Sequence, residues 1–187
     1  MNRARTLTLV VLSAAALALT ACGSSTSSTA TTAPSTTTAP STTPTTSGPP
    51  TSIPAADLSA AGTAGTAPTV VVPKGNPPTQ LETADLITGT GPAAKAGDSV
   101  TVQYVLATYS SGKTIQSSWT GQPFTFTLDA TPEQVIPGWD QGVVGMQVGG
   151  RRELIIPPSL GYGAQSPGAG IAANDTLVFV VDLLKIN

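Results

Sequence analysis

Apolar and polar residues alternate along two stretches in the second half of the chain, at residues 100–107 and 124–128. In the first stretch the apolar positions are Val100, Val102, Tyr104 and Leu106. A period of two residues places alternate side chains on one face of a strand, so both stretches are predicted to be half-buried strands. Other runs bounded by turn residues predict strands at 81–88, 114–117, 151–156 and 176–186, the last of which is expected to be central.

The spacing of apolar residues changes between residues 133 and 146. They recur there at intervals of three and four, at Val135, Ile136, Trp139, Val143 and Met146. This spacing is typical of a short helix, and Pro137 fits near the start of that helix, where a missing N–H costs little. Because strands surround one late helix, we expect an α+β fold in which a twisted antiparallel β-sheet wraps around one short α-helix.

The first 22 residues resemble a bacterial lipoprotein signal peptide. Arg3 and Arg5 precede an apolar run at residues 7–19, which is shorter than a membrane-spanning helix of about 20 residues. Leu19-Thr20-Ala21-Cys22 resembles a lipobox, in which the cysteine is lipidated. Cys22 is therefore expected to anchor the protein at the extracytoplasmic face of a bacterial cell membrane. The alternative is an ordinary secretion signal with an unrelated cysteine.

Residues 23–69 are predicted to be a disordered linker. Residues 23–67 contain only Ala, Ser, Thr, Gly and Pro, apart from Ile53, Asp57 and Leu58. Such a segment buries too little apolar area to offset the entropy of ordering it. Its Ser, Thr and Pro content is also typical of O-glycosylated stalks, so a glycosylated linker is an alternative. The folded domain is expected at residues 70–187, because all the aromatic residues lie between Tyr104 and Phe179.

The composition excludes several kinds of chemistry. The chain has 187 residues, no histidine, one cysteine and a net charge of −2. It therefore has no Ser-His-Asp triad, no multi-cysteine zinc or iron–sulfur site, and no excess of basic residues of the kind that binds nucleic acid. No metal and no cofactor are expected. Arg151, Arg152 and Glu153 are interpreted as a solvated face of a strand.

Several motifs follow one another between residues 135 and 184. They are Val135-Ile136-Pro137-Gly138-Trp139, Gly145-Met146, Gly149, Leu160-Gly161-Tyr162-Gly163, Thr176-Leu177-Val178-Phe179 and Asp182-Leu183-Leu184. In kind and spacing these motifs resemble the FKBP-type peptidyl-prolyl cis-trans isomerases, over about residues 80–187. The resemblance implies a twisted antiparallel sheet wrapped on a short helix, with a shallow apolar pocket between them that takes a proline ring.

The resemblance also implies the residues of the site. Three would act in catalysis: Trp139 as the pocket floor, the Ile136 N–H as donor to a substrate carbonyl, and the Tyr162 hydroxyl as a second donor. The expected substrate-binding residues are Tyr104, Ile115, Gln116, Phe124, Val135, Ile171 and Phe179. Two places depart from the family pattern, because Ile115-Gln116 stands for Phe-Asp and Ile171-Ala172-Ala173 stands for Ile-Pro-Pro.

The implied function is prolyl cis–trans isomerisation that assists the folding of exported or surface proteins, by a protein tethered to the membrane. Rotation about an X–Pro bond breaks no bond, so the reaction suits a chain without histidine. The expected partners are proline-containing polypeptides, the membrane through a lipidated Cys22, and macrolide inhibitors of the family. Nucleic acid is not an expected partner, and a monomer is expected. The alternatives are a catalytically weak FKBP-like binding module or chaperone, and an unrelated β-rich surface lipoprotein.

Overall fold

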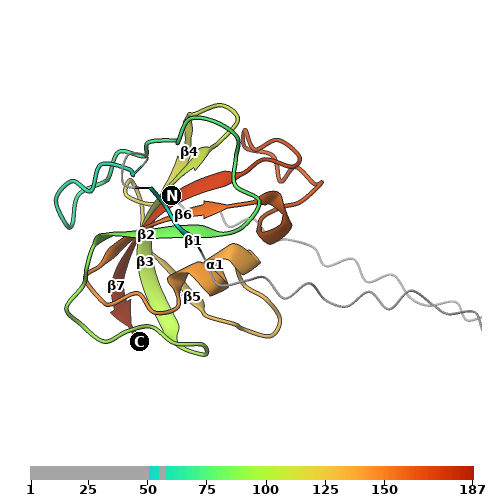
Figure 1. Ribbon diagram of the computed structural model, residues 1–187. Helices are drawn as coiled ribbons and strands as arrows, with labels where there is room; N and C mark the ends of the chain where they lie inside the picture. The colour runs from blue at the N-terminus through green and yellow to red at the C-terminus, as the bar shows by residue number, and fades with distance from the viewer. Residues whose placement is uncertain (1–50, 55–57) are drawn as a thin grey trace, which may run out of the picture. The chain divides into compact units, whose positions relative to one another are not determined.

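The two longest strands, β3 (Ser99–Thr108) and β7 (Leu177–Ile186), pair side by side in the middle of the sheet. The computed structural model describes residues 51–54 and 58–187, and Figure 1 shows how their elements are arranged. The remaining elements are β1 (Thr51–Ser52), β2 (Glu82–Ile87), β4 (Thr114–Ser117), β5 (Phe124–Thr127), α1 (Pro137–Val143), β6 (Arg151–Ile156) and the 3-10 turn η2 (Pro158–Leu160). Every strand predicted from the sequence is present, within one or two residues at its ends.

The sheet has seven strands in the order β1-β2-β6-β7-β3-β4, and β5 also pairs with β3. One edge of β3 is shared, because β5 pairs with its first half and β4 with its second. All pairings are antiparallel except the parallel contact between β1 and β2. The predicted α+β fold, a sheet around one short helix, is confirmed, with one parallel pair added.

Helix α1 is shorter than the predicted 133–146 and lies very close to β6. Pro137 occupies its first turn, and the helix spans seven residues. A Cβ atom added to Gly138 would lie 2.4 Å from Ile156 Cγ2, and one added to Gly142 would lie 2.7 Å from Leu154 Cδ2. A larger residue at either position would displace Ile156 or Leu154, so this pair of glycines allows the close approach of the helix to the sheet.

The opposite face of the sheet is covered by an N-terminal segment, residues 51–54 and 58–72, which we call the strap. Its strand β1 pairs with the start of β2, and the Ile53 N–H donates to the Thr83 carbonyl at 3.3 Å. Ile53 is buried against Ile155 and Val178. Leu58, Val70 and Val72 pack against the same small apolar cluster.

The strap corrects two of the sequence-based expectations. The predicted linker at 23–69 has structure at 51–54 and 58–69, because the apolar side chains that interrupt its polar composition pack on the sheet. The predicted solvated face of β6 is also wrong for Arg151 and Glu153, which are almost fully buried under the strap. The predictions for residues 1–50, including the signal peptide at 1–22 and lipidation of Cys22, lie outside the described residues.

Hydrogen bonds tie the strap to the buried charges of β6. Arg151 pairs with Asp182 of β7 through two bonds, at 2.6 and 2.8 Å. Its guanidinium also donates to the carbonyls of Ala61 and Thr66 in the strap. The N–H and hydroxyl of Ser59 donate to the two carboxylate oxygens of Glu153, at 2.8 and 2.6 Å. Within the described part of the chain, no helix is long and apolar enough to cross a bilayer.

Candidate active site

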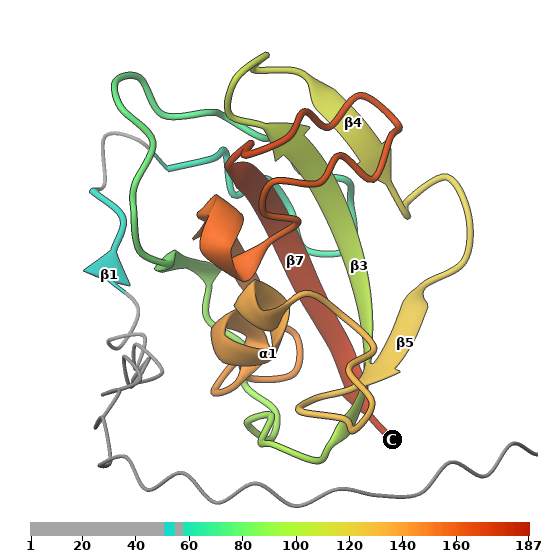
Figure 2. The ribbon, with the colours of Figure 1, turned by 90° about the vertical axis from the view of Figure 1, so that its right-hand side faces the viewer.

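A cavity of about 250 Å³ opens between α1 and the inner face of the sheet. Figure 2 looks onto this side of the sheet, where α1 lies in front of β7. The cavity is lined by Tyr104, Leu106, Gln116, Phe124, Gln134, Val135, Ile136, Trp139, Tyr162 and Phe179. These residues come from four strands (β3, β4, β5 and β7), from α1 and the loop before it, and from the loop that follows η2. The fold therefore brings together aromatic side chains that lie far apart in the sequence.

Trp139 is the centre of this aromatic arrangement. It projects from α1, is 4% exposed, and meets its neighbours edge to face. Ring centroids of Tyr104, Phe126 and Phe179 lie 5.3, 5.3 and 5.2 Å from that of Trp139. Such edge-to-face contacts hold each ring in one orientation and add about 0.5–1.5 kcal/mol per pair beyond area burial. The indole is thus a rigid floor for the cavity.

Two aromatic side chains form the mouth of the cavity. Phe124 is 38% exposed and Tyr162 is 40% exposed. Phe124 stacks on Phe126 of the same strand at 5.4 Å, which fixes its ring. An apolar ligand entering the cavity would therefore bury parts of both rings that water now contacts, and this burial favours binding.

The backbone at the start of α1 presents a free donor to the cavity. Ile136 lies immediately before the helix in an extended conformation, with φ −65° and ψ 147°. Its carbonyl accepts from the Trp139 N–H at 2.9 Å. Within the described residues, neither the Ile136 N–H nor the Tyr162 hydroxyl takes part in a hydrogen bond. Both residues line the cavity, which makes these two groups candidate donors to the carbonyl oxygens of a peptide.

The cavity contains no charged side chain at neutral pH. Its two titratable residues are the phenols Tyr104 and Tyr162. Burial, and secondly the proximity of Tyr162, raises the pKa of Tyr104 above its ordinary value of 10.0. Gln116 places a neutral amide at the cavity wall, at the position where the family usually has an aspartate. The described residues also hold no cluster of three or more side chains that could bind a metal ion.

An acidic group lies just behind the cavity, on α1. Burial raises the pKa of Asp140, and the nearby Asp129 and Glu133 carboxylates raise it further. A hydrogen bond from the Asp129 N–H to Asp140 Oδ1, at 2.9 Å, acts in the opposite direction. Asp140 does not line the cavity, so its charge concerns the stability of the helix and its loop.

Eight of the ten side chains expected at the site line the cavity. The two others, Ile115 and Ile171, lie beside it and pack against the core. Ile115 approaches the loop after η2, where its Cδ1 would be 3.2 Å from a Cβ atom on Gly170. Ile171 is held through its backbone, because its carbonyl accepts from Ser166 Oγ at 2.6 Å.

Two lining residues were not expected. Leu106 follows Tyr104 by two positions on β3, so the alternation of that strand was a usable signal for it. Gln134 had no such signal. Its Oε1 accepts from the Thr127 N–H at 2.9 Å and so ties the loop before α1 to the end of β5.

Comparisons with known proteins point to one family. Residues 91–184 match the model of the FKBP-type peptidyl-prolyl cis-trans isomerases. A FK506-binding protein from Streptomyces anulatus is 53% identical over 100 residues, which cover 52% of this chain and 79% of that protein. FK506-binding protein 4 from Aspergillus fumigatus is 47% identical over 98 residues, which cover 52% of this chain and 19% of that protein.

Solved structures agree with the sequence comparisons. FkpA from Escherichia coli is 40% identical, with a TM-score of 0.52 over 58% of this chain and 49% of that one. AtFKBP13 is 32% identical, with a TM-score of 0.51 over 59% of this chain and 96% of that one. The chain belongs to the FKBP-type peptidyl-prolyl cis-trans isomerase family. The strap lies outside the residues that match the family model.

Proposed function

We propose that this protein is a prolyl isomerase that is tethered to a membrane and acts on exported or surface polypeptides. The observation that carries the isomerase part is the uncharged aromatic cavity, floored by Trp139, with the unpaired Ile136 N–H at its wall. A proline ring is apolar and compact, and it carries no N–H. An uncharged aromatic hollow with one donor beside it complements such a group.

The geometry suits catalysis by selective binding of a twisted amide. The barrier to X–Pro rotation, about 18–20 kcal/mol for a peptide bond, comes from amide resonance. Resonance is lost in the twisted state, which is less polar along the C–N bond and therefore fits an apolar, water-poor site better than the planar amide does. The Ile136 N–H would hold a substrate carbonyl, and Trp139 would hold the ring. No nucleophile and no acid–base group is needed.

The replacement of a carboxylate by Gln116 favours a second candidate function. The Gln116 amide offers both a donor and an acceptor at the cavity wall, but no charge. A site that binds proline segments without strongly favouring the twisted state would act as a binding module or a chaperone. The exposed rings of Phe124 and Tyr162 would serve that role equally well. Macrolides of the kind that the family binds are proposed ligands of the same cavity.

The proposed location rests on the sequence of residues 1–22. A lipidated Cys22 would contribute about 0.8 kcal/mol for each buried CH₂, so that several acyl chains hold a protein stably on a membrane. The test is membrane fractionation of the wild type and of Cys22→Ser. We expect the wild type in the membrane fraction and the variant in the soluble fraction. Equal partitioning of the two would overturn the proposed anchor.

The isomerase part is tested by NMR exchange measurements on a neutral X–Pro peptide with the purified full chain. We expect faster cis–trans exchange with the wild type, and a loss of at least tenfold with Trp139→Ala. Restoration of the carboxylate by Gln116→Asp separates the two candidates. A large gain in rate would favour the binding module as the natural role, whereas an unchanged rate would favour the isomerase.

A further inference from the structure

A second hollow adjoins the cavity at the end of the loop before α1. Its volume is about 350 Å³. It shares four lining residues with the cavity, which are Gln134, Val135, Ile136 and Tyr162. Its other lining residues are Glu133, Pro137 and Gly161. The two hollows therefore share a wall that these four residues form.

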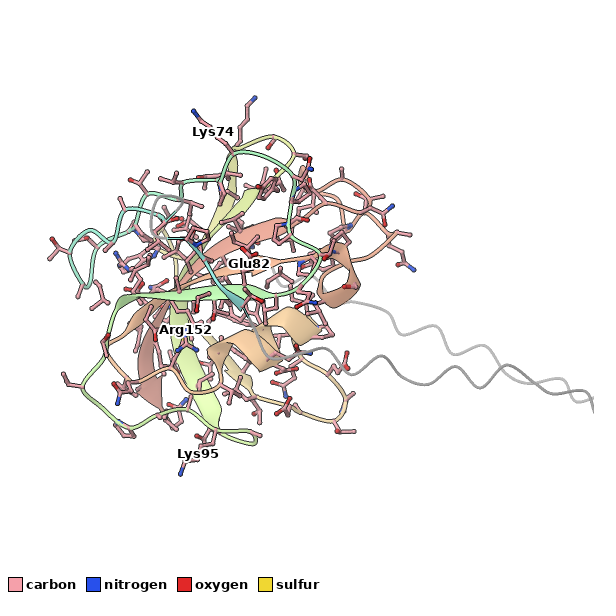
Figure 3. The ribbon with its side chains drawn as sticks, in the orientation of Figure 1. Lys74, Glu82, Lys95 and Arg152 are labelled. Carbon is pink, nitrogen blue, oxygen red and sulfur yellow. The ribbon has the colours of Figure 1, made fainter. Side chains whose placement is uncertain are left out.

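Glu133 is the one charged side chain that lines either hollow among the described residues. It is exposed, and Asp129 and Asp140 are further carboxyl groups close by, since the Asp129 and Glu133 carboxylates both raise the pKa of Asp140. No lysine or arginine lines either hollow. Lys74 and Lys95 project into solvent at opposite ends of the molecule in Figure 3. The second hollow is thus a negative environment beside a neutral cavity.

A peptide whose proline fills the cavity can extend over the wall that the two hollows share. Consecutive Cα atoms lie about 3.8 Å apart, so a peptide that crosses this shared wall places the side chain next to proline at the second hollow. We propose that this hollow receives that side chain, and that Glu133 selects lysine or arginine there and disfavours aspartate or glutamate. This inference rests on the proposed isomerase function and specifies the substrate class of the same site.

The expected preference is moderate, because Glu133 is in contact with water. At a separation of about 7 Å in water, a single charge pair changes an equilibrium by roughly threefold. A lysine peptide and a glutamate peptide should therefore differ by about five- to tenfold in kcat/KM. Salt at about 1 M shortens the screening length to about 3 Å and should bring this ratio close to one.

The experiment compares peptides that are identical except for one residue next to proline. That residue is Lys, Gln or Glu, placed before the proline in one set and after it in the other. Exchange rates are measured by NMR, which avoids a coupling protease with a charge preference of its own, using the full chain in a zwitterionic detergent. The expected lysine-to-glutamate ratio is about five to ten at one of the two positions for the wild type.

Two variants and one control sharpen the measurement. Glu133→Gln should reduce the ratio to about two or less, and Glu133→Lys should invert it. Asp85→Asn removes the same charge from β2, outside both hollows, and should leave the ratio at its wild-type value. The ratio is taken between peptides on one protein sample, so a change in the amount of folded protein cancels.

The outcomes separate this inference from the proposed function. If the wild type accelerates exchange of the Gln peptides but shows a ratio near one at both positions, the charge selection is overturned and the isomerase stands. If Glu133→Gln keeps the full ratio, Glu133 is not the selecting residue and the inference is again overturned. If no peptide of either set is accelerated, the proposed isomerase function itself fails.

Discussion

The two faces of the sheet differ in the kind of side chain that they bury. The face under α1 is apolar and aromatic, and its cavity carries no charge. The face under the strap buries Arg151, Glu153 and Asp182, with Trp119 near the Arg151 guanidinium at 5.9 Å. The first face lies within the residues that match the family, whereas the strap that covers the second does not. The face under α1 is therefore suited to binding ligands, and the face under the strap is suited to holding a segment of the chain in place.

The energetics of the two faces differ in kind. On the apolar face, a change in the shape of one side chain lowers the free energy of unfolding gradually, because each single contact contributes little. A buried charge depends on a few specific partners, and removal of one partner leaves the other uncompensated at a cost of about 3–5 kcal/mol. Substitutions on the strap face should therefore change stability and spare the cavity, while substitutions at the cavity should change activity.

The largest expected effect is that of Arg151→Met. This change leaves Asp182 buried without its partner and removes the donors to the Ala61 and Thr66 carbonyls. We expect the free energy of unfolding to fall by about 3–5 kcal/mol in urea titrations. Asp85→Ala, which breaks an exposed pair with Arg152, is the control and should cost at most about 1 kcal/mol. Equal, small losses would mean that the strap face is solvated.

A smaller loss is expected for Ser59→Ala in the strap. The variant removes the hydroxyl donor to the buried Glu153 carboxylate but keeps the backbone N–H bond. Hydrogen bonds to charged groups contribute about 1.5–3 kcal/mol, which is the expected loss on urea unfolding. Thr66→Ala removes an exposed hydroxyl from the same strap and should be nearly neutral. A neutral Ser59→Ala would argue against docking of the strap in solution.

A gain in stability, smaller than the loss for Ser59→Ala, is expected for Asp140→Asn. The folded-state pKa of Asp140 is raised, so the folded protein binds a proton more readily than the unfolded chain does. Stability should therefore fall as the pH rises from about 4 through the folded-state pKa. The variant keeps an acceptor for the Asp129 N–H and should be more stable at pH 7, with that pH dependence removed. Thermal unfolding across pH 4–7 measures this, and a less stable variant at pH 7 would contradict it.

The smallest expected effect is the response of isomerisation to pH. The only titratable side chains of the cavity are Tyr104 and Tyr162, and the pKa of Tyr104 is raised. The rate with a neutral peptide should be flat between pH 5 and about 8.5. Gln116→Glu should introduce a dependence in the acidic part of that range. A bell-shaped dependence of the wild-type rate on pH would show that titrating groups take part in the reaction, and would contradict this prediction.

Much of the apolar face could be predicted from the sequence. The alternation at Tyr104 and Leu106 and the spacing around Trp139 mark residues whose burial follows directly from their own chemistry. The motifs indicated a resemblance to the family, and that resemblance implied most of the residues that line the cavity. Ile115 is not among the residues that line the cavity, and its side chain lies next to Gly170 in the loop after η2.

The strap face could not be predicted in the same way. Charged residues such as Arg151 and Glu153 indicate exposure unless something covers them, and the cover comes from a segment that is nearly all small and polar. Its apolar signals were Ile53, Leu58 and the valines at its end, of which Val70 and Val72 pack on the same cluster. The partners that make the burial tolerable are backbone carbonyls and a serine, whose positions no residue pattern reveals.

The cis–trans exchange rate of a neutral X–Pro peptide tests most sharply whether the aromatic cavity is the site of isomerisation. It is measured by NMR with wild type, Trp139→Ala and Arg151→Met, at a temperature where all three are folded. We expect strong acceleration by the wild type, a loss of at least tenfold for Trp139→Ala, and near wild-type rates for Arg151→Met despite its lower stability. Exchange at the uncatalysed rate with the folded wild type would contradict the claim.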